Sequence, residues 1–155
     1  MPERSSAPTW LRLVLTMLVV LGTTIALAPG AQAASCYRTT CNNKDPNGQS
    51  CNTGLTTPQS KYIYSDARVD LRYSSECDAN WGRFVYSGAW NCCVQGTLTA
   101  QQQHWNGSAW VAYRTKTKTF TWGATQDNIW TNMNPNETND RHRACVDGVC
   151  TGWNS

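Results

Sequence analysis

The sequence predicts a small, mainly β domain, an antiparallel sandwich or barrel-like fold that is stapled by disulfides and has a cysteine-rich N-terminal loop region. Segments that alternate apolar and polar residues recur, and no segment after residue 33 shows a helical apolar stripe over about ten residues. Eight cysteines occur in 155 residues. Two dipeptides favoured in tight hairpin turns, Asn106-Gly107 and Asp147-Gly148, join strand-like segments.

The first 33 residues have the order of a secretory signal peptide. A polar start with Arg4 and Arg12 precedes an apolar run from Leu13 to Leu27, and the triplet Ala31-Gln32-Ala33 follows. The run is shorter than the roughly 20 residues that span a bilayer. We therefore expect cleavage after Ala33 and a secreted protein without membrane attachment. A retained anchor and a lipoprotein modified at Cys36 are the alternatives.

Residues 34–155 fit one domain. Cleavage removes Glu3, Arg4 and Arg12 and leaves a formal net charge of +2, and no run of Lys and Arg is present, so we expect no nucleic-acid partner. All eight cysteines remain, and an exported chain meets an oxidising environment. Four disulfides are therefore expected among Cys36, Cys41, Cys51, Cys77, Cys92, Cys93, Cys145 and Cys150.

Residues 35–60 show no apolar periodicity and predict a loop region that its cysteines hold together. Within it, Asp45-Pro46-Asn47-Gly48 has the residue preferences of a type I turn. The Asn and Asp residues here lack the full pattern of a calcium loop and its closing Glu. The cysteine spacings exceed those of zinc fingers. We therefore expect no metal and no cofactor.

Strands are expected next at residues 62–65, 69–73 and 83–87, where polar and apolar residues alternate. Between the last two, Cys77 to Trp81 predicts a turn or a single helical turn that Ser74 or Ser75 caps.

Residues 94–121 predict a hairpin around Asn106-Gly107. A two-residue turn sets Trp105 opposite Ser108, and a four-residue loop sets it opposite Trp110. Strict alternation gives the same faces in both registers. The outer face should carry Thr97, Thr99, Gln101, Gln103, Trp105, Trp110, Arg114, Lys116 and Lys118, and the buried face Val94, Leu98, Ala100, Val111 and Tyr113.

A second hairpin follows from Asp147-Gly148 as a two-residue turn, which sets Cys145 opposite Cys150. The Cα atoms of such a pair approach to about 4.5 Å, within the range of a disulfide. We therefore predict a Cys145–Cys150 bond. Cys92 and Cys93 are neighbours whose side chains leave opposite faces of a strand, so we expect them to enter two separate bridges.

Two stretches carry a combined motif, Cys36-x4-Cys41-x3-Asp45-Pro46-x4-Cys51 and Val69-Asp-Leu-Arg-Tyr-Ser74-x2-Cys77-Asp-Ala79-Asn-Trp81-Gly-Arg83. Together they resemble the YjfA family, small exported bacterial proteins built on domain of unknown function 2690. The match extends to Met133 and Arg143-Ala144-Cys145, so the family-like core is residues 36–145. The resemblance implies an exported protein and no established chemistry.

The residues that catalysis requires are not assembled in any motif. The chain has no Gly-x-Ser-x-Gly elbow, and no motif surrounds His104 or His142. Asp66, Asp70 and nearby acids are close in sequence, but alternation does not show that they converge. We expect no enzyme, with a wall-acting hydrolase that uses Asp or Glu as the alternative.

Seven Trp residues in residues 34–155 exceed what one small core readily absorbs. Exposed aromatic rings mark binding sites, and Trp suits sugar rings and protein partners. The sequence therefore predicts an extracellular binding module for cell-wall or other polysaccharide, with a protein-binding inhibitor or toxin-like factor as the alternative. Core packing of the aromatic rings and internal pairing of the arginines are the structural alternatives. The candidate ligand-binding residues are Trp105, Trp110, Trp122 and Trp130, together with Arg72, Trp81 and Arg83.

Overall fold

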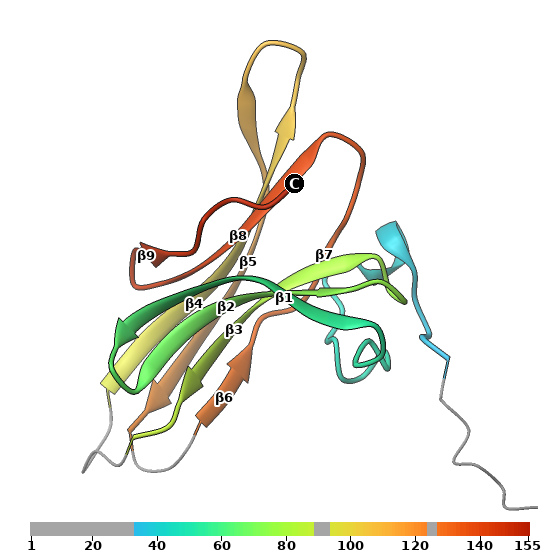
Figure 1. Cartoon of the computed structure of the whole chain (residues 1–155). Helices are drawn as coiled ribbons and strands as arrows, with labels where there is room; N and C mark the ends of the chain where they lie inside the picture. The colour runs from blue at the N-terminus through green and yellow to red at the C-terminus, as the bar shows by residue number, and fades with distance from the viewer. Residues whose placement is uncertain (1–32, 89–93, 124–126) are drawn as a thin grey trace, which may run out of the picture. The chain divides into compact units, whose positions relative to one another are not determined.

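A computed structural model describes residues 33–88, 94–123 and 127–155, which form two antiparallel sheets (Figure 1). Sheet A has the order β1 (Leu55–Tyr64), β2 (Ala67–Ser74), β3 (Ala79–Tyr86), β6 (Asp127–Trp130), and β7 (Asn134–Pro135) also pairs with β3. Sheet B has the order β5 (Trp110–Trp122), β4 (Val94–Trp105), β8 (Asp140–Val146), β9 (Val149–Cys150). The predicted mainly β, disulfide-stapled sandwich is confirmed. The predicted signal peptide, apart from Ala33, lies outside the described residues.

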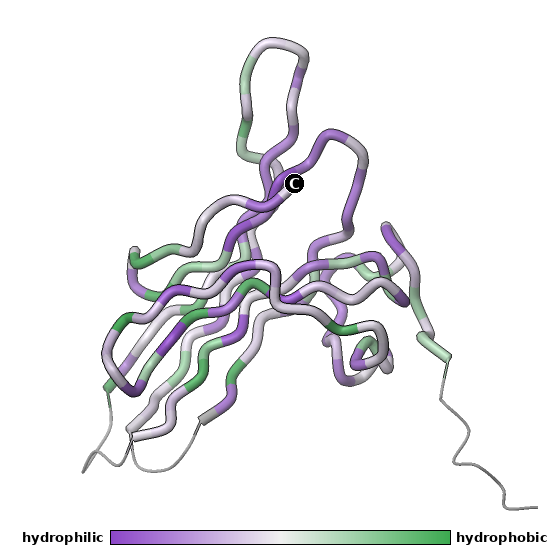
Figure 2. The backbone as a smooth tube through the Cα atoms, in the orientation of Figure 1, coloured by the Kyte–Doolittle hydropathy of each residue, from purple (hydrophilic) through white to green (hydrophobic). Residues whose placement is uncertain are grey.

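The main core lies between the two sheets. Alternate residues of β2 and β3, including Val69, Leu71 and Phe84, face Leu98 of β4 and Ala144 of β8. Figure 2 shows the apolar positions interspersed with polar ones along these strands. Burial of one face of each strand is what period-two alternation predicts.

The β4–β5 hairpin closes through a four-residue loop, because Trp105 pairs with Trp110. Asn106 stabilises this loop, since its Oδ1 accepts hydrogen bonds from the backbone N–H groups of Ser108, at 3.0 Å, and Ala109, at 2.9 Å. Of the two registers that the sequence allowed, the structure has the one in which a four-residue loop sets Trp105 opposite Trp110.

A β-bulge changes the faces of β5. Gln102 pairs with Arg114 and Gln103 with Ala112, so Tyr113 is an extra residue on β5. The expectation that strict alternation fixes the faces was therefore wrong beyond this point. The side chains of Arg114, Lys116 and Lys118 share the inner face with Gln102, Ala100 and Leu98, whereas Val111 and Tyr113 are exposed.

The cysteine-rich region packs on the outer face of sheet A. It contains one turn of 3-10 helix, η1 (Arg38–Cys41), and disulfides join Cys36 to Cys41 and Cys51 to Cys77. These four cysteines form a second, smaller core with Trp81 and Met133. The region ends earlier than expected, because residues 55–60 belong to β1. Pro58 is tolerated there, since it lies at an irregularity of an edge strand.

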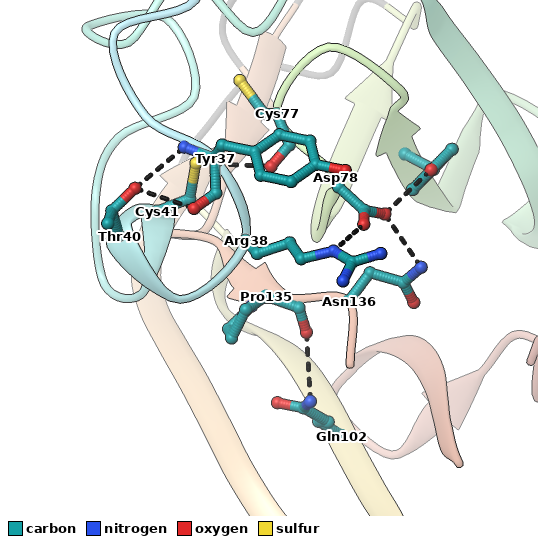
Figure 3. A network of polar contacts seen from close by, with 10 residues as sticks. Tyr37, Arg38, Thr40, Cys41, Cys77, Asp78, Gln102, Pro135 and Asn136 are labelled. Carbon is teal, nitrogen blue, oxygen red and sulfur yellow. Dashed lines mark hydrogen bonds and ion pairs between the residues drawn. The ribbon is translucent and has the colours of Figure 1, made fainter. Parts of the chain in front are cut away.

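A carboxylate attaches this region to sheet A (Figure 3). Asp78 accepts hydrogen bonds from Arg38 Nε at 2.6 Å, from Tyr73 Oη at 3.0 Å and from Asn136 Nδ2 at 3.0 Å. Burial alone would raise the pKa of Asp78, but these donors and the charge of Arg38 outweigh burial and lower the pKa below its usual value. Asp78 is thus ionised and joins three separate segments.

The turn that contains Asp78 is shorter than the sequence indicated. The expected turn or helical turn from Cys77 to Trp81 ends at Asp78, because Ala79 to Trp81 begin β3. Ser74 does cap it, since its Oγ accepts a hydrogen bond from the N–H of Cys77 at 3.3 Å.

The predicted bond between Cys145 and Cys150 is confirmed, with the two Cα atoms 4.0 Å apart. Cys92 and Cys93 lie outside the described residues. The expectation that they enter two separate bridges therefore lies outside the described residues as well, and the other six cysteines pair among themselves. Among the described residues, no helix is both long enough and apolar enough to cross a membrane.

Candidate functional site

Four of the predicted ligand-binding residues meet in one hollow on the outer face of sheet A. This Arg–Trp hollow has a volume of about 240 Å³. Its lining combines two guanidinium groups, two indole rings, three amides and one apolar side chain. They belong to Arg72, Arg83, Trp81, Trp130, Asn47, Asn52, Asn128 and Leu55. The sequence indicated the arginines and tryptophans but not the asparagines.

Strand pairing brings the four residues together. Arg72 of β2 pairs with Trp81 of β3, and Arg83 of β3 pairs with Trp130 of β6. Directly paired residues of antiparallel strands share a face, and so do residues two apart on one strand. Trp81 and Arg83 are two apart, and Phe84 next to them faces the core. The other three therefore lie with Arg83 on the side opposite the core.

The Asp45-Pro46-Asn47-Gly48 turn holds one wall of the hollow in place. Asp45 Oδ1 accepts hydrogen bonds from the N–H groups of Asn47 at 2.8 Å and Gly48 at 3.1 Å, as expected of a turn that begins with Asp. Its other oxygen accepts a hydrogen bond from Trp130 Nε1 at 3.2 Å. The turn thus orients the Trp130 ring and places the Asn47 amide beside it.

A buried carboxylate lies behind the arginines. Asp70 is 0% exposed and accepts hydrogen bonds from Ser60 Oγ at 2.7 Å, from Arg68 Nε at 3.1 Å and from Arg83 Nη2 at 2.6 Å. Burial alone would raise the pKa of Asp70, but these bonds and the two arginine charges outweigh burial and lower the pKa. Asp70 is therefore ionised and fixes the orientation of Arg83. The structural interpretation of Arg83, an internal pair with Asp70, is confirmed.

Arg72 has a different environment. Its Nη1 donates a hydrogen bond to Thr57 Oγ1, and it makes no ion pair with any described residue. Burial and the positive charges of Arg83 and Arg68 lower the pKa of Arg72, while the charge of Asp70 acts against them. The hollow therefore contains a guanidinium that forms no ion pair with a carboxylate of the described residues.

The two rings of the hollow differ in exposure. Trp81 is only 4% exposed, because the cysteine-rich region packs over it, and it forms part of the floor. Trp130 is half-buried. Trp130 and Asn128 also line a second hollow of about 350 Å³, together with Asp45, Lys118 of β5 and others. Trp130 therefore contributes to both hollows.

Trp105 and Trp110 lie elsewhere, on the outer face of sheet B, within a stack of alternating rings and guanidinium groups. Their ring centroids are 5.5 Å apart. The Arg141 guanidinium carbon is 4.5 Å from the Trp110 centroid and 4.6 Å from that of Trp153, and Arg143 is 4.4 Å from Trp153. We name these five residues the Trp–Arg stack. Arg141, Arg143 and Trp153 were not predicted members, because no strand was expected directly before Cys145 and Trp153 follows the last strand.

Trp122 belongs to the main core. It is 6% exposed, and its ring centroid lies 4.9 Å from Tyr86 and 5.2 Å from Phe84. Trp122 therefore packs between the sheets, as the structural alternative had it. It does not belong to the predicted ligand-binding site.

The chain matches the model of one known protein family. A family model described as a protein of unknown function, DUF2690, matches residues 39–145. Neither the curated proteins nor the solved structures include one that matches the chain. The matched range includes Arg72, Trp81, Arg83 and Trp130 of the Arg–Trp hollow. It also spans every strand except β9 and the last residue of β8. The chain therefore belongs to the DUF2690 family.

Proposed function

We propose that this protein is an extracellular, non-catalytic binding module, and that it binds cell-wall or other polysaccharide through the Arg–Trp hollow. The observation that carries the proposal is the convergence of two indole rings, three amides and two guanidinium groups in one hollow. Indole rings offer flat apolar surface to a sugar ring, and amide groups both donate and accept hydrogen bonds to hydroxyl groups.

The size of the hollow fits one unit of a polymer. Its volume of about 240 Å³ is below the roughly 300–1,000 Å³ of pockets that enclose a whole drug-sized ligand. The second hollow, of about 350 Å³, shares Trp130 and Asn128 with the first. A polysaccharide chain that continues past Trp130 would contact both.

Export is part of the proposal and rests on two observations. The first 33 residues have the pattern of a signal peptide. Three disulfides are formed in the described residues, which fits an oxidising compartment.

A wall-acting hydrolase is the competing proposal, and the environments of the buried acids favour binding over turnover. Asp70 and Asp78 are held ionised by arginines, whereas a general acid must carry a proton near neutral pH. Asp140 is hydrogen-bonded to Gln102 and to His104. A release assay for reducing ends on the same polysaccharides would detect turnover and overturn the non-catalytic part.

Co-sedimentation tests the binding. The oxidised secreted protein, with its disulfides checked by non-reducing intact mass, is mixed with purified cell wall and with insoluble polysaccharides. We expect saturable pelleting that Trp130→Ala weakens by about tenfold or more, as for a central aromatic contact. Tyr62→Ala is the matched control, because Tyr62 is an exposed aromatic of sheet A that does not line the hollow. Pelleting that Trp130→Ala leaves unchanged would contradict the site.

A protein partner is the second candidate, and the hairpin tip favours it. Trp105, Val111 and Tyr113 are exposed at 37%, 40% and 49%, on a hairpin that extends beyond sheet A (Figure 1). Aromatic and arginine side chains are enriched in protein interfaces. If no polysaccharide pellets the protein, a pull-down from culture fluid with wild type and Trp105→Ala/Trp110→Ala decides whether the Trp–Arg stack binds a protein.

A further inference from the structure

Three guanidinium groups surround a single carboxylate on the outer face of sheet A. Arg68 and Arg83 both form ion pairs with Asp70. Arg72 lies near enough for the charges of these three residues to shift its pKa. The cluster therefore carries two positive charges in excess of its one negative charge. The excess is located at the Arg–Trp hollow, since Arg72 and Arg83 line it and Arg68 does not.

The position of Arg72 is unfavourable for a cation. Its side chain is partly buried, its neighbours Arg83 and Arg68 are positive, and the Thr57 hydroxyl is a neutral acceptor. Partial burial of a charge costs free energy that a paired anion offsets. Arg83 is placed differently, because its Nε and Nη2 both donate to Asp70 Oδ2. Of the two arginines in the hollow, Arg72 is thus the one whose charge a ligand would neutralise.

We propose that the ligand of the Arg–Trp hollow is an acidic polysaccharide, and that Arg72 binds the oxyanion of one of its sugars while Trp130 and the asparagines bind the uncharged parts. This inference rests on the proposed function. A guanidinium pairs with a carboxylate or a phosphate through two parallel hydrogen bonds, so both groups fit the same chemistry. Trp130 lies across the β3–β6 pair from Arg83, and it lines the same hollow of about 240 Å³ as Arg72.

The second hollow agrees with this assignment. Its two charged residues are Lys118 and Asp45. Both oxygens of Asp45 already accept hydrogen bonds, from Trp130 and from the turn N–H groups. Lys118 is exposed on the inner side of β5 and forms no ion pair within the described chain. A polymer with a repeating negative charge would therefore meet a second cation on the far side of Trp130.

Matched polymer pairs test the inference. Calorimetric titration compares polygalacturonate with its methyl ester, and a phosphorylated mannan with the same mannan after phosphatase treatment. We expect one acidic member to bind at least about tenfold more tightly than its neutral partner, as for a hydrogen bond to a charged group. The preferred pair distinguishes carboxylate from phosphate. Equal binding of both members in both pairs would overturn the inference and leave the proposed function standing.

Variants locate the charge preference. Arg72→Gln should reduce the preference for the acidic member to about twofold or less while the weak binding of the neutral member remains. Lys61→Gln removes one positive charge from an exposed position on β1 and should leave the preference unchanged. An Arg72→Gln protein that keeps the full preference would refute the role of Arg72. Absence of binding to all four polymers would overturn the inference, and absence of pelleting in the co-sedimentation as well would refute the proposed function.

Folding of the variant does not limit this test. The comparison of each acidic polymer with its neutral partner uses the wild-type protein alone. A second wild-type measurement, the loss of acidic-polymer affinity as salt increases, reports the same charge contact. If Arg72→Gln fails to form its disulfides, Arg72→Lys replaces it. This variant keeps the positive charge but cannot form the bidentate pair of hydrogen bonds. We expect it to keep part of the preference for the acidic polymer.

Discussion

The His142 imidazole is buried in the interior of the sandwich. Its side chain projects from β8 toward the core side, it is 2% exposed, and neither ring nitrogen bonds to a described residue. Burial, against which the charge of Asp140 acts, lowers the pKa of His142 from 6.5 to about 4. The imidazole is therefore neutral in the folded protein at neutral and mildly acidic pH.

This pKa predicts a loss of stability in mild acid. Between pH 6.5 and 5 the unfolded chain goes from half to almost fully protonated at His142 while the folded chain stays neutral, so the free energy of unfolding should fall by about 1.5 kcal/mol. Urea denaturation at several pH values measures the fall. His142→Leu should remove it, and His104→Gln, at the chain's other histidine, should keep it. The same slope in His142→Leu would contradict the assignment.

Asp70 and Asp78 affect stability only at lower pH, so they do not obscure the effect of His142 between pH 6.5 and 5. The pKa values of Asp70 and Asp78 are lowered in the folded state. Their contribution to stability is therefore fully present above the unfolded value of about 3.8 and is lost as the pH falls below it. Between pH 6.5 and 5 both groups are ionised in the folded protein and nearly so in the unfolded chain.

The positions of individual tryptophans depend on contacts that the sequence does not show. Trp122 and Trp130 both end strands that lie near each other in the chain. Trp122 faces the core because it pairs with Val94, and Trp130 faces outward because it pairs with Arg83. Each partner is more than 25 residues away in sequence, beyond the reach of local periodicity. The sequence therefore predicted an excess of rings but could not separate core rings from site rings.

Single strands were predictable where they follow strict alternation. Residues 69–73 and 94–105 were expected as strands and lie within β2 and β4. The β5 faces could not be predicted, because one bulged residue, Tyr113, reverses the face of every residue that follows it. No turn-forming residue marks this position in the sequence.

The close approach of the two sheets depends on Gly82 of β3. A Cβ atom at this position would lie 3.2 Å from Leu98 Cδ1 and from the Thr99 carbonyl oxygen, and 3.4 Å from Ala144 Cβ. Because one of these neighbours is backbone and the others are core, Gly82→Ala should lower the free energy of unfolding by about 1–3 kcal/mol. Guanidinium denaturation measures the change.

Gly48→Ala is the control for this prediction. A Cβ atom there would make only ordinary contacts, at 3.7 and 3.8 Å, in an exposed turn. We expect a change within about 0.5 kcal/mol. Equal stability of the two alanine variants would contradict this prediction. It would mean that the sheets can move apart at position 82 without a loss of free energy of unfolding.

At the scale of the whole molecule, the three described disulfides differ in the length of chain that they close. Cys51–Cys77 joins residues 26 apart and connects the cysteine-rich region to the end of sheet A. Cys36–Cys41 and Cys145–Cys150 each join residues five apart. Only the last of these was predictable, because a two-residue turn sets its geometry locally. The other two depend on how the cysteine-rich region folds back on sheet A.

Loop length ranks the disulfides by their contribution to stability. Replacement of both cysteines by alanine should cost about 3.5 kcal/mol for Cys51–Cys77 and about 2 kcal/mol for Cys145–Cys150, if constraint of the unfolded chain dominates. Denaturation of the two double variants under oxidising conditions measures the difference. An equal or reversed order would show that the cysteine-rich region contributes little to the cooperative unit.

The fold class was predictable because it depends on composition and alternation, which act along the whole chain. The two-sheet arrangement and the Arg–Trp hollow depend on pairing between distant strands. Arg72, Trp81, Arg83 and Trp130 come from three strands, and Asn47 and Asn52 come from the cysteine-rich region. Local patterns therefore indicated several of the right residue types, while only the structure shows which of them meet.

The bulge at Tyr113 also bears on self-association. β5 is the terminal strand of sheet B, and a terminal strand presents backbone groups to which another chain can add. The bulge turns Arg114, Lys116 and Lys118 to the inner face of that edge. Any strand that added to β5 would place its own side chains directly beside three cations. One extra residue thus hinders edge-to-edge aggregation along the longest of the described strands.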